Sequence, residues 1–252
     1  MRHRNRGAVL RFILRRPRLN GLGYRSVCFV PRDTRIGGDE CMRFVVGMMA
    51  LALLTAAAPV EPPMVRVRLE TSAGPIVIAL DTRHAPKTAA NFLAYVDDQR
   101  LDGTAFFRAS RRPGKPGLGF IEGGIGTDAR RRLGTLPLEP TSKTGLRHVD
   151  GVISMARYDA LDSGTANFSL MSGPFPNMDA RPGSPGYAVF GKVVTGMEVV
   201  KRILAMPTSQ GGEGPMKGET LRRPVSIVRA VRLDGTPHPT GRVKVWQMLP
   251  RK

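Results

Sequence analysis

The chain has 252 residues, which is enough for one or two domains. Its 39 Lys+Arg residues against 20 Asp+Glu give a formal charge of +19, a balance that favours a nucleic acid or an anionic membrane as partner. Eleven of the basic residues lie within residues 1–58, however, and those further along are scattered. The 29 Gly, 21 Pro and 41% hydrophobic residues favour a turn-rich, mostly β protein and exclude collagen, coiled coils and low-complexity disorder. We therefore expect one folded domain and no nucleic-acid partner.

Residues 42–58 have the layout of a secretory signal peptide. One basic residue follows Met42, an apolar run extends from Phe44 to Leu54, and small residues come next. The run is shorter than the roughly 20 residues that a membrane-spanning helix needs. We predict cleavage near residue 58 and no membrane insertion afterwards, with residues 59–64 as a linker; a buried helix is the alternative.

Residues 1–41 form a basic leader without apolar periodicity. Because the signal layout is complete from Met42, we predict that translation begins there; a long n-region and a nucleic-acid arm are the alternatives. Both cysteines, Cys28 and Cys41, precede the predicted cleavage site. The mature protein is thus expected in the periplasm or outside the cell, with neither a disulfide nor a cysteine metal site.

The rest of the chain reads as short strands with two helices. Alternating residues 65–70, a turn and an apolar run at 76–80 predict a β-hairpin. Pro86 and the helical spacing of the apolar residues after it predict a helix over 86–97. A second helix is predicted at 197–204, capped by Thr195. Further strands are predicted at 105–109, 119–122, 151–156, 167–171, 187–193 and 225–233.

This order of elements predicts a mainly β fold over residues 65–234. Seven or eight strands with two helices in about 175 residues favour a closed antiparallel barrel capped by the helices. The tail at 235–252 contains Trp246 and three prolines, and the pattern does not decide whether it packs on the barrel.

Several short motifs resemble catalytic or binding signatures, but their context favours turns. Asp162-Ser163-Gly164 matches the aspartic protease signature, but no second copy is present, so such a protease would have to be a dimer. Gly123-Gly124-Ile125-Gly126 lacks the Lys-Ser/Thr of a phosphate loop. His84, His148 and His238 are isolated, so no metal site is predicted.

Six blocks in order carry a family resemblance. They are APKTAANF (85–92), FFR (106–108), GFIEGG (119–124), GVISMAR (151–157), DSGTANFSL (162–170) and YAVFGKVVTGMEVV (187–200). This series resembles the cyclophilin family of peptidyl-prolyl cis/trans isomerases, and among them the secreted bacterial forms. The resemblance runs from about residue 65 to 233, and it implies a closed eight-stranded antiparallel barrel capped by two α-helices.

The resemblance also implies an activity and a site. The reaction is rotation about the bond before proline, whose barrier of about 18–20 kcal/mol comes from amide resonance. It needs no nucleophile, cofactor or metal. Arg108 stands where the family has its catalytic arginine, and a guanidinium suits that role because it stays charged and carries several donors in one plane. The expected substrate-binding residues are Phe107, Phe120, Glu122, Ala156, Asn167, Ser169, Met178 and Tyr187.

Several positions depart from the family pattern. Glu122 replaces a glutamine, Gly119 and Ser169 replace phenylalanines, and Asn167 is one methylene shorter than the family's glutamine. Ser169 removes part of an apolar floor that Phe107 or Phe120 could refill, and Glu122 could pair with Arg108. Asn177 lies where the family has the indole that contacts cyclosporin, so we expect weak binding of that drug.

Two main functions remain open at this point. The first is a monomeric isomerase that assists the folding of exported proteins by acting on proline-containing, unfolded or extended polypeptides. The second is a catalytically weak module of the same fold that binds proline-containing segments. The protease based on Asp162-Ser163-Gly164 is a remote third.

Overall fold

The computed structural model describes residues 63–211 and 214–248. The predicted leader (1–41), the predicted signal peptide (42–58) and both cysteines lie outside the described residues. Of the predicted linker (59–64), Met64 already belongs to the first strand. The described strands are β1 (Met64–Thr71), β2 (Gly74–Asp81), β3 (Thr104–Arg112), β4 (Lys115–Gly124), β5 (Val152–Met155), β6 (Phe168–Ser172), β7 (Ala188–Thr195) and β8 (Thr220–Arg232).

The eight strands close into one barrel. Their order is β1-β2-β7-β5-β6-β4-β3-β8, and neighbouring strands pair antiparallel around the barrel. Closure leaves the barrel without a free sheet edge. The prediction of a closed eight-stranded antiparallel barrel is therefore confirmed.

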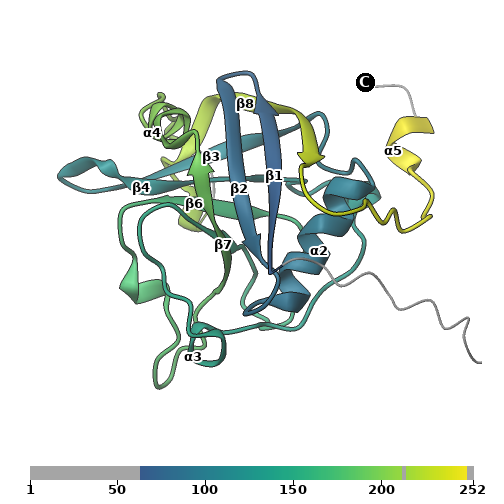
Figure 1. Ribbon diagram of the computed structural model, residues 1–252. Coiled ribbons are helices and arrows are strands. Elements are labelled where there is room, and N and C mark those ends of the chain that lie inside the picture. Colours follow the sequence, from purple (N-terminus) through teal and green to yellow (C-terminus); the bar gives the residue numbers. More distant parts are fainter. Residues whose placement is uncertain (1–62, 212–213, 249–252) are drawn as a thin grey trace, which may run out of the picture. The chain divides into compact units, whose positions relative to one another are not determined.

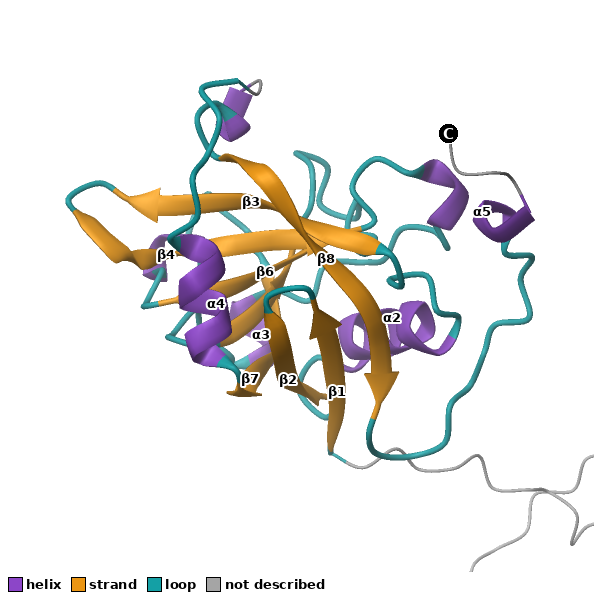
Figure 2. Ribbon diagram, turned by 90° about the horizontal axis from the view of Figure 1, so that it is seen from above, coloured by secondary structure: helices purple, strands orange, loops and turns teal. Residues whose placement is uncertain are grey.

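Two helices pack on the strands. α2 (Pro86–Asp97) begins with proline in its first turn, as predicted, and α4 (Met197–Leu204) is the second helix. They lie on opposite sides of the strands in Figures 1 and 2. Shorter helices are α3 (Thr141–Thr144), α5 (Val245–Met248) and three 3-10 turns at Ala129–Arg131, Pro176–Met178 and Gly214–Met216.

The start of α4 corrects one prediction. Thr195 is the last residue of β7, where it pairs with Val77, and the N-cap of α4 is Gly196. Gly196 has φ +95°, and a Cβ atom there would come within 2.5 Å of the Pro75 carbonyl oxygen. Only glycine suits that close, left-handed approach, so the turn into α4 is set by backbone conformation and not by a threonine cap.

Aromatic side chains fill the barrel. Phe92 from α2 packs edge-on against Phe168 with ring centroids 5.2 Å apart, and Phe106 meets Phe168 at 5.7 Å. Phe190 lies 5.5 Å from Phe92. Because these four rings are fully buried, the interior is a packed core and any ligand site must lie outside it.

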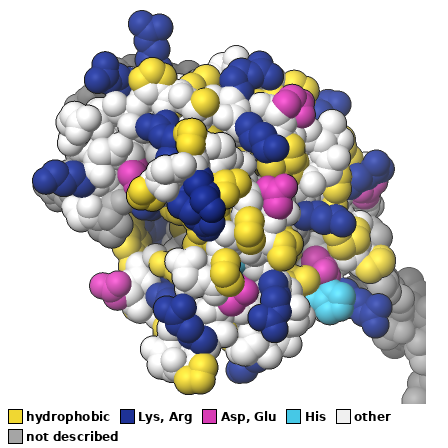
Figure 3. Space-filling view, turned by 90° about the vertical axis from the view of Figure 1, so that its left-hand side faces the viewer, with side chains coloured by type: hydrophobic (Ala, Val, Ile, Leu, Met, Phe, Trp, Pro, Cys, Tyr) yellow, Lys and Arg dark blue, Asp and Glu magenta, His cyan; other side chains and the backbone are white. Residues whose placement is uncertain are grey.

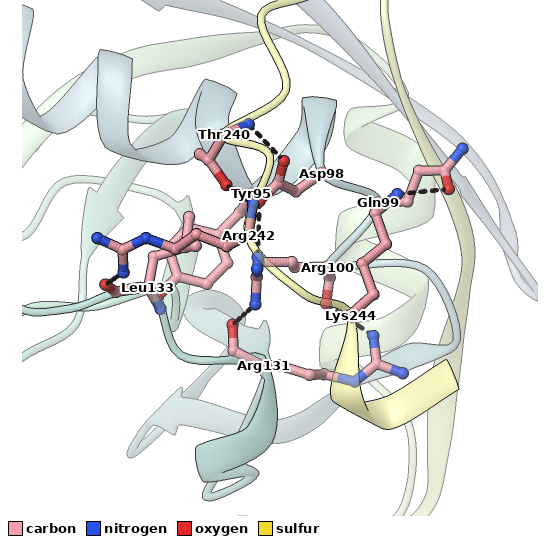
Figure 4. A network of polar contacts seen from close by, with 9 residues as sticks. All are labelled: Tyr95, Asp98, Gln99, Arg100, Arg131, Leu133, Thr240, Arg242 and Lys244. Atoms are coloured by element: carbon pink, nitrogen blue, oxygen red, sulfur yellow. Dashed lines mark hydrogen bonds and ion pairs between the residues drawn. The ribbon is translucent and has the colours of Figure 1, made fainter. Parts of the chain in front are cut away.

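The tail after β8 packs on the barrel domain, which the sequence left open. Thr240 donates to Asp98 through its backbone N–H at 2.7 Å and through its hydroxyl. Trp246 lies over the guanidinium groups of Arg100 and Arg131, at 4.7 and 5.1 Å from the ring centroid. Figure 4 shows Thr240 beside Asp98, and Arg131 beside Arg100, at the C-terminal end of α2.

Two arginines and the tail compensate the negative charge at the C-terminal end of α2. Asp97 is the last residue of that helix and Asp98 is its C-cap, and carboxylates at a helix C-terminus oppose the helix dipole. Arg100 pairs with Asp98 at 2.9 Å, and Arg232 pairs with Asp97 at 2.6 Å. Backbone N–H groups of the tail add to this, including that of His238, which donates to Asp97.

No helix among the described residues is long and apolar enough to cross a membrane.

Candidate active site

A cavity of about 390 Å³ opens on the outer face of the barrel. It is bounded by β3, β4, β5 and β6, by the 3-10 turn Pro176–Met178, and by the residues that follow β5 and precede β7. The lining residues are Arg108, Phe120, Glu122, Ser154, Met155, Ala156, Arg157, Ser169, Asn177, Met178 and Tyr187.

Strand alternation explains which side chains reach this cavity. In β4, Ile121 is fully buried in the core while Phe120 and Glu122 line the cavity. In β6, Phe168 enters the core and Ser169 lines the cavity. Successive side chains of a strand point to opposite faces, so the residues that alternate with the core residues line the cavity.

A β-bulge places Arg108. Phe106 pairs with Gly123 and Arg108 pairs with Glu122, so Phe107 is an extra residue on β3. The same interruption appears on the other side, against β8. A bulge changes the direction of the residues around it, and here Phe106 is buried while Arg108 lines the cavity.

Two carboxylates hold the guanidinium of Arg108. Nη1 donates to Glu122 at 2.9 Å, and Nε donates to Glu219 at 2.8 Å. Nη2 lies 2.7 Å from the same Glu219 oxygen. The guanidinium carbon also lies 5.1 Å from the ring centroid of Phe120. The plane of the guanidinium is thereby fixed from three directions.

The pairing keeps Arg108 charged despite its burial. The Arg108 side chain is 16% exposed, and burial by itself lowers the pKa of a guanidinium. Glu122 and Glu219 outweigh that effect, so the pKa of Arg108 is raised above its ordinary value. The cavity wall therefore carries a permanent cation that is compensated by neighbouring carboxylates.

Most of the predicted site residues come together. Arg108, Phe120, Glu122, Ala156, Ser169, Met178 and Tyr187 all line the one cavity. The backbone N–H of Tyr187 donates to the Met178 carbonyl at 3.1 Å, which ties two of the walls together. Arg157 lies over the Tyr187 ring at 4.9 Å and extends that wall.

Two predicted residues do not line this cavity. Phe107 is the bulged residue of β3, so Phe120 and not Phe107 is the aromatic group available beside Ser169. Asn167 uses its amide on Gly126, accepting from its N–H at 2.8 Å and donating to its carbonyl at 3.0 Å. The shorter asparagine thus fixes a loop.

Two features of the site were not found from the sequence. Glu219 lies 111 residues from Arg108 and comes directly before β8, so only the closing of the barrel brings the two together. His148 contacts both Ser154 and Asp179, although no sequence spacing links the three.

The protease motif forms a turn. Asp162 accepts from the backbone N–H of Leu138, and Ser163 donates to the Ala160 carbonyl. Gly164 bridges to Leu136. These contacts are those of a loop, and none of the three motif residues lines the cavity. In the part of the chain that the structure describes, no cluster of three or more His, Cys, Asp or Glu residues could hold a metal ion.

Comparison with known proteins identifies the family. Residues 66–231 match the model of the cyclophilin type peptidyl-prolyl cis-trans isomerases. This chain belongs to the cyclophilin family. Its resemblance to that family, predicted from the six sequence blocks, is confirmed.

Bacterial cyclophilins are among its relatives. The chain is 36% identical to peptidyl-prolyl cis-trans isomerase A of Dickeya dadantii over 172 residues, which cover 68% of this chain and 88% of the relative. It is 33% identical to a peptidyl-prolyl cis-trans isomerase of Acinetobacter baylyi over 162 residues, covering 64% and 82% of the two chains.

Solved cyclophilins share the fold. A cyclophilin type isomerase of Cryptosporidium parvum matches with a TM-score of 0.55 at 21% identity, covering 69% of this chain and 99% of that one. A second structure of it, solved in the presence of the dipeptide Ala-Pro, matches with a TM-score of 0.54 at 21% identity, covering 68% and 99%. With this family, the prediction of a peptidyl-prolyl cis/trans isomerase is confirmed.

Proposed function

We propose that this cyclophilin isomerises X-Pro bonds in exported polypeptides, with Arg108 as its catalytic group. The observation that carries the proposal is the Arg108 guanidinium on the wall of a cavity shared with Phe120, Met178 and Tyr187. A prolyl ring packs well against apolar and aromatic side chains, and the peptide bond beside it would then face the cation.

The chemistry follows from the amide bond. Rotation about the X-Pro bond breaks resonance and leaves a lone pair on a pyramidal nitrogen. A guanidinium N–H that donates to this nitrogen stabilises the twisted state more than the planar one, which lowers the barrier. Because Glu122 and Glu219 already fix the guanidinium, little reorganisation is needed as the bond turns. No covalent bond forms or breaks, so the reaction requires no cofactor.

Extended proline-containing polypeptides are the proposed partners. The Cryptosporidium structure solved with the dipeptide Ala-Pro supports this substrate class. On the face drawn in Figure 3, Lys and Arg side chains are dispersed among hydrophobic and acidic ones and form no continuous track. That dispersion supports a polypeptide over a nucleic acid as substrate. We propose that the protein acts as a monomer.

The proposed place of action is the periplasm or the cell exterior. The support is the signal layout of residues 42–58, with its single basic residue, short apolar run and small residues. A reporter fused after residue 64 tests this: export is expected from a start at Met42, and loss of export is expected when Met42 is replaced. Retention of the Met42-initiated fusion in the cytoplasm would contradict it.

A matched pair of arginine variants tests the activity. Arg112 is on the same strand and also lies over an aromatic ring, that of Phe175 at 4.9 Å, but it does not line the cavity. We expect Arg108→Ala to lower kcat/KM for X-Pro peptides by about 10²–10³-fold, as for the loss of one aimed donor. Arg112→Ala should keep the wild-type rate. Equal rates in both variants, with unchanged circular dichroism, would refute the role of Arg108.

A binding module is the second candidate. The observation that favours it is the ion pair between Arg108 and Glu122, since a cation engaged by a carboxylate is less available to a substrate. Such a module would bind proline-containing peptides without accelerating their isomerisation.

A further inference from the structure

Three side chains beside the cavity form a serine, histidine and aspartate relay. Nε2 of His148 lies 2.9 Å from Oγ of Ser154, and Nδ1 of His148 lies 2.7 Å from Oδ1 of Asp179. The backbone N–H of His148 also donates to that aspartate oxygen at 2.9 Å. A base within hydrogen-bond reach of a hydroxyl, oriented by a third group, is the geometry of an activated nucleophile.

The His148 imidazole is in the neutral form that a general base requires. The His148 side chain is fully buried, and burial lowers its pKa more than Asp179 raises it. The imidazole is therefore neutral at neutral pH. With a carboxylate at Nδ1, the ring proton lies on that nitrogen, so Nε2 is left to accept the Ser154 proton.

The serine faces the cavity. Ser154 is 1% exposed but belongs to the cavity lining, so the cavity is its route to solvent. Register pairs place Arg108, Glu122, Ser169 and Ser154 in one row across β3, β4, β6 and β5. Ser169, the neighbour of Ser154 in this row, has a small side chain and also lines the cavity.

A cation is available near the same opening. Arg157 lines the cavity, and its Nε and Nη1 donate to carbonyl oxygens of Gly186, Tyr158 and Asp159. Within the described residues Arg157 has no carboxylate partner, in contrast to Arg108. Its positive charge is therefore not neutralised by a carboxylate, and it adds positive potential to the cavity in which an oxyanion would develop.

We propose that Ser154 is a nucleophile activated by His148 and Asp179, and that it gives this protein an esterase activity toward small activated esters. Oγ of Ser154 bonds to the ester carbonyl carbon while its proton passes to Nε2 of His148. The carbon–oxygen bond of the leaving alcohol then breaks, and that oxygen takes the proton from Nε2. Water attacks the acyl-serine by the same route, which releases the acid and restores Ser154. This activity is separate from proline isomerisation and requires no oxidant or metal.

A covalent probe tests the proposal directly. The purified protein is incubated with an alkyl fluorophosphonate, which loses fluoride when a nucleophilic serine attacks, and the adduct is located by peptide mass spectrometry. Ser172→Ala is the matched control, because Ser172 is also a buried strand serine but donates to the Gly117 carbonyl and lies outside the cavity lining. We expect an adduct on Ser154 in the wild type and in Ser172→Ala, and none in Ser154→Ala.

A second variant separates activation from folding. Asp179→Asn keeps the size of the side chain but no longer stabilises the imidazolium, so labelling of Ser154 and hydrolysis of p-nitrophenyl acetate should both fall at least about tenfold. Circular dichroism shows whether each variant is folded. Absence of an adduct on Ser154 in the wild type, or equal labelling in Asp179→Asn, would overturn the proposal and leave the relay as a structural tie between two loops.

Discussion

Arg108 is held by two carboxylates, one on β4 and one just before β8, and each has a distinct effect. Glu122 lies opposite Arg108 in register and binds Nη1, while Glu219 binds Nε and Nη2 and also accepts from the Ser110 hydroxyl at 2.7 Å. Glu219 is thus anchored and aligns the guanidinium, whereas Glu122 lines the cavity, so we expect its carboxylate to compete with a substrate for the same cation.

Replacing Glu122 and Ser169 should raise activity. Glu122→Gln keeps an acceptor for Arg108 but removes the competing charge, and Ser169→Phe restores an apolar floor to the cavity. We expect the double variant to have a higher kcat/KM for X-Pro peptides than the wild type, with the single variants separating the two effects. No gain would mean that the cavity, with Phe120 beside Ser169, binds proline in another way.

Glu219 is a positioning residue, and its removal should act mainly on turnover. Glu219→Ala leaves the guanidinium held by Glu122 and the Phe120 ring, so we expect kcat to fall about tenfold, equivalent to about 1.4 kcal/mol, with KM little changed. Glu219→Gln should recover part of the loss because its amide oxygen still accepts. A rise in KM at constant kcat would show that Glu219 serves substrate binding instead.

At the scale of elements, local pattern predicted the strands and α2 but not the contacts between distant segments. The alternation at 65–70 and Pro86 are local signals, and both gave correct elements. Three features were missed: the contact of Glu219 with Arg108, the contacts of His148, and the packing of the tail on Asp98. Each depends on how the chain folds back on itself, which no local spacing encodes. The prediction that Thr195 caps α4 was wrong because Gly196, in the left-handed conformation, makes the turn.

The tail should stabilise the domain without affecting the cavity. Trp246 packs on Arg100 and Arg131, and cation–π contacts of this kind contribute about 0.5–1 kcal/mol each at exposed sites. We expect Trp246→Ala to lower the free energy of unfolding by about 1 kcal/mol in urea titrations. Met248 lies in the same short helix and is 72% exposed, so Met248→Ala is the matched control and should leave stability unchanged. Equal effects of the two variants would contradict the role of Trp246.

For the whole molecule, buried His148 predicts a pH dependence of stability. The pKa of His148 is lowered from 6.5 in the folded state, chiefly by burial. As pH falls, His148 therefore takes up a proton in the unfolded chain before it does so in the folded protein. The stability that comes from neutral His148 is fully present above pH 6.5 and is lost progressively below it, down to the folded pKa. Thermal melting between pH 7.5 and 5 should show a falling Tm for the wild type. The slope should be smaller in His148→Asn, and identical slopes would contradict the prediction.

As a whole, the molecule is expected to bind a proline-containing peptide and to turn over its cis and trans forms. The most direct test is two-dimensional exchange NMR on an X-Pro peptide with a catalytic amount of the purified protein, because one experiment reports both binding and cis/trans exchange. We predict exchange cross-peaks between the cis and trans forms at mixing times too short for the uncatalysed reaction, which takes about 10–100 s at 25 °C. Shifted peptide resonances without accelerated exchange would contradict the account and leave a binding module in its place.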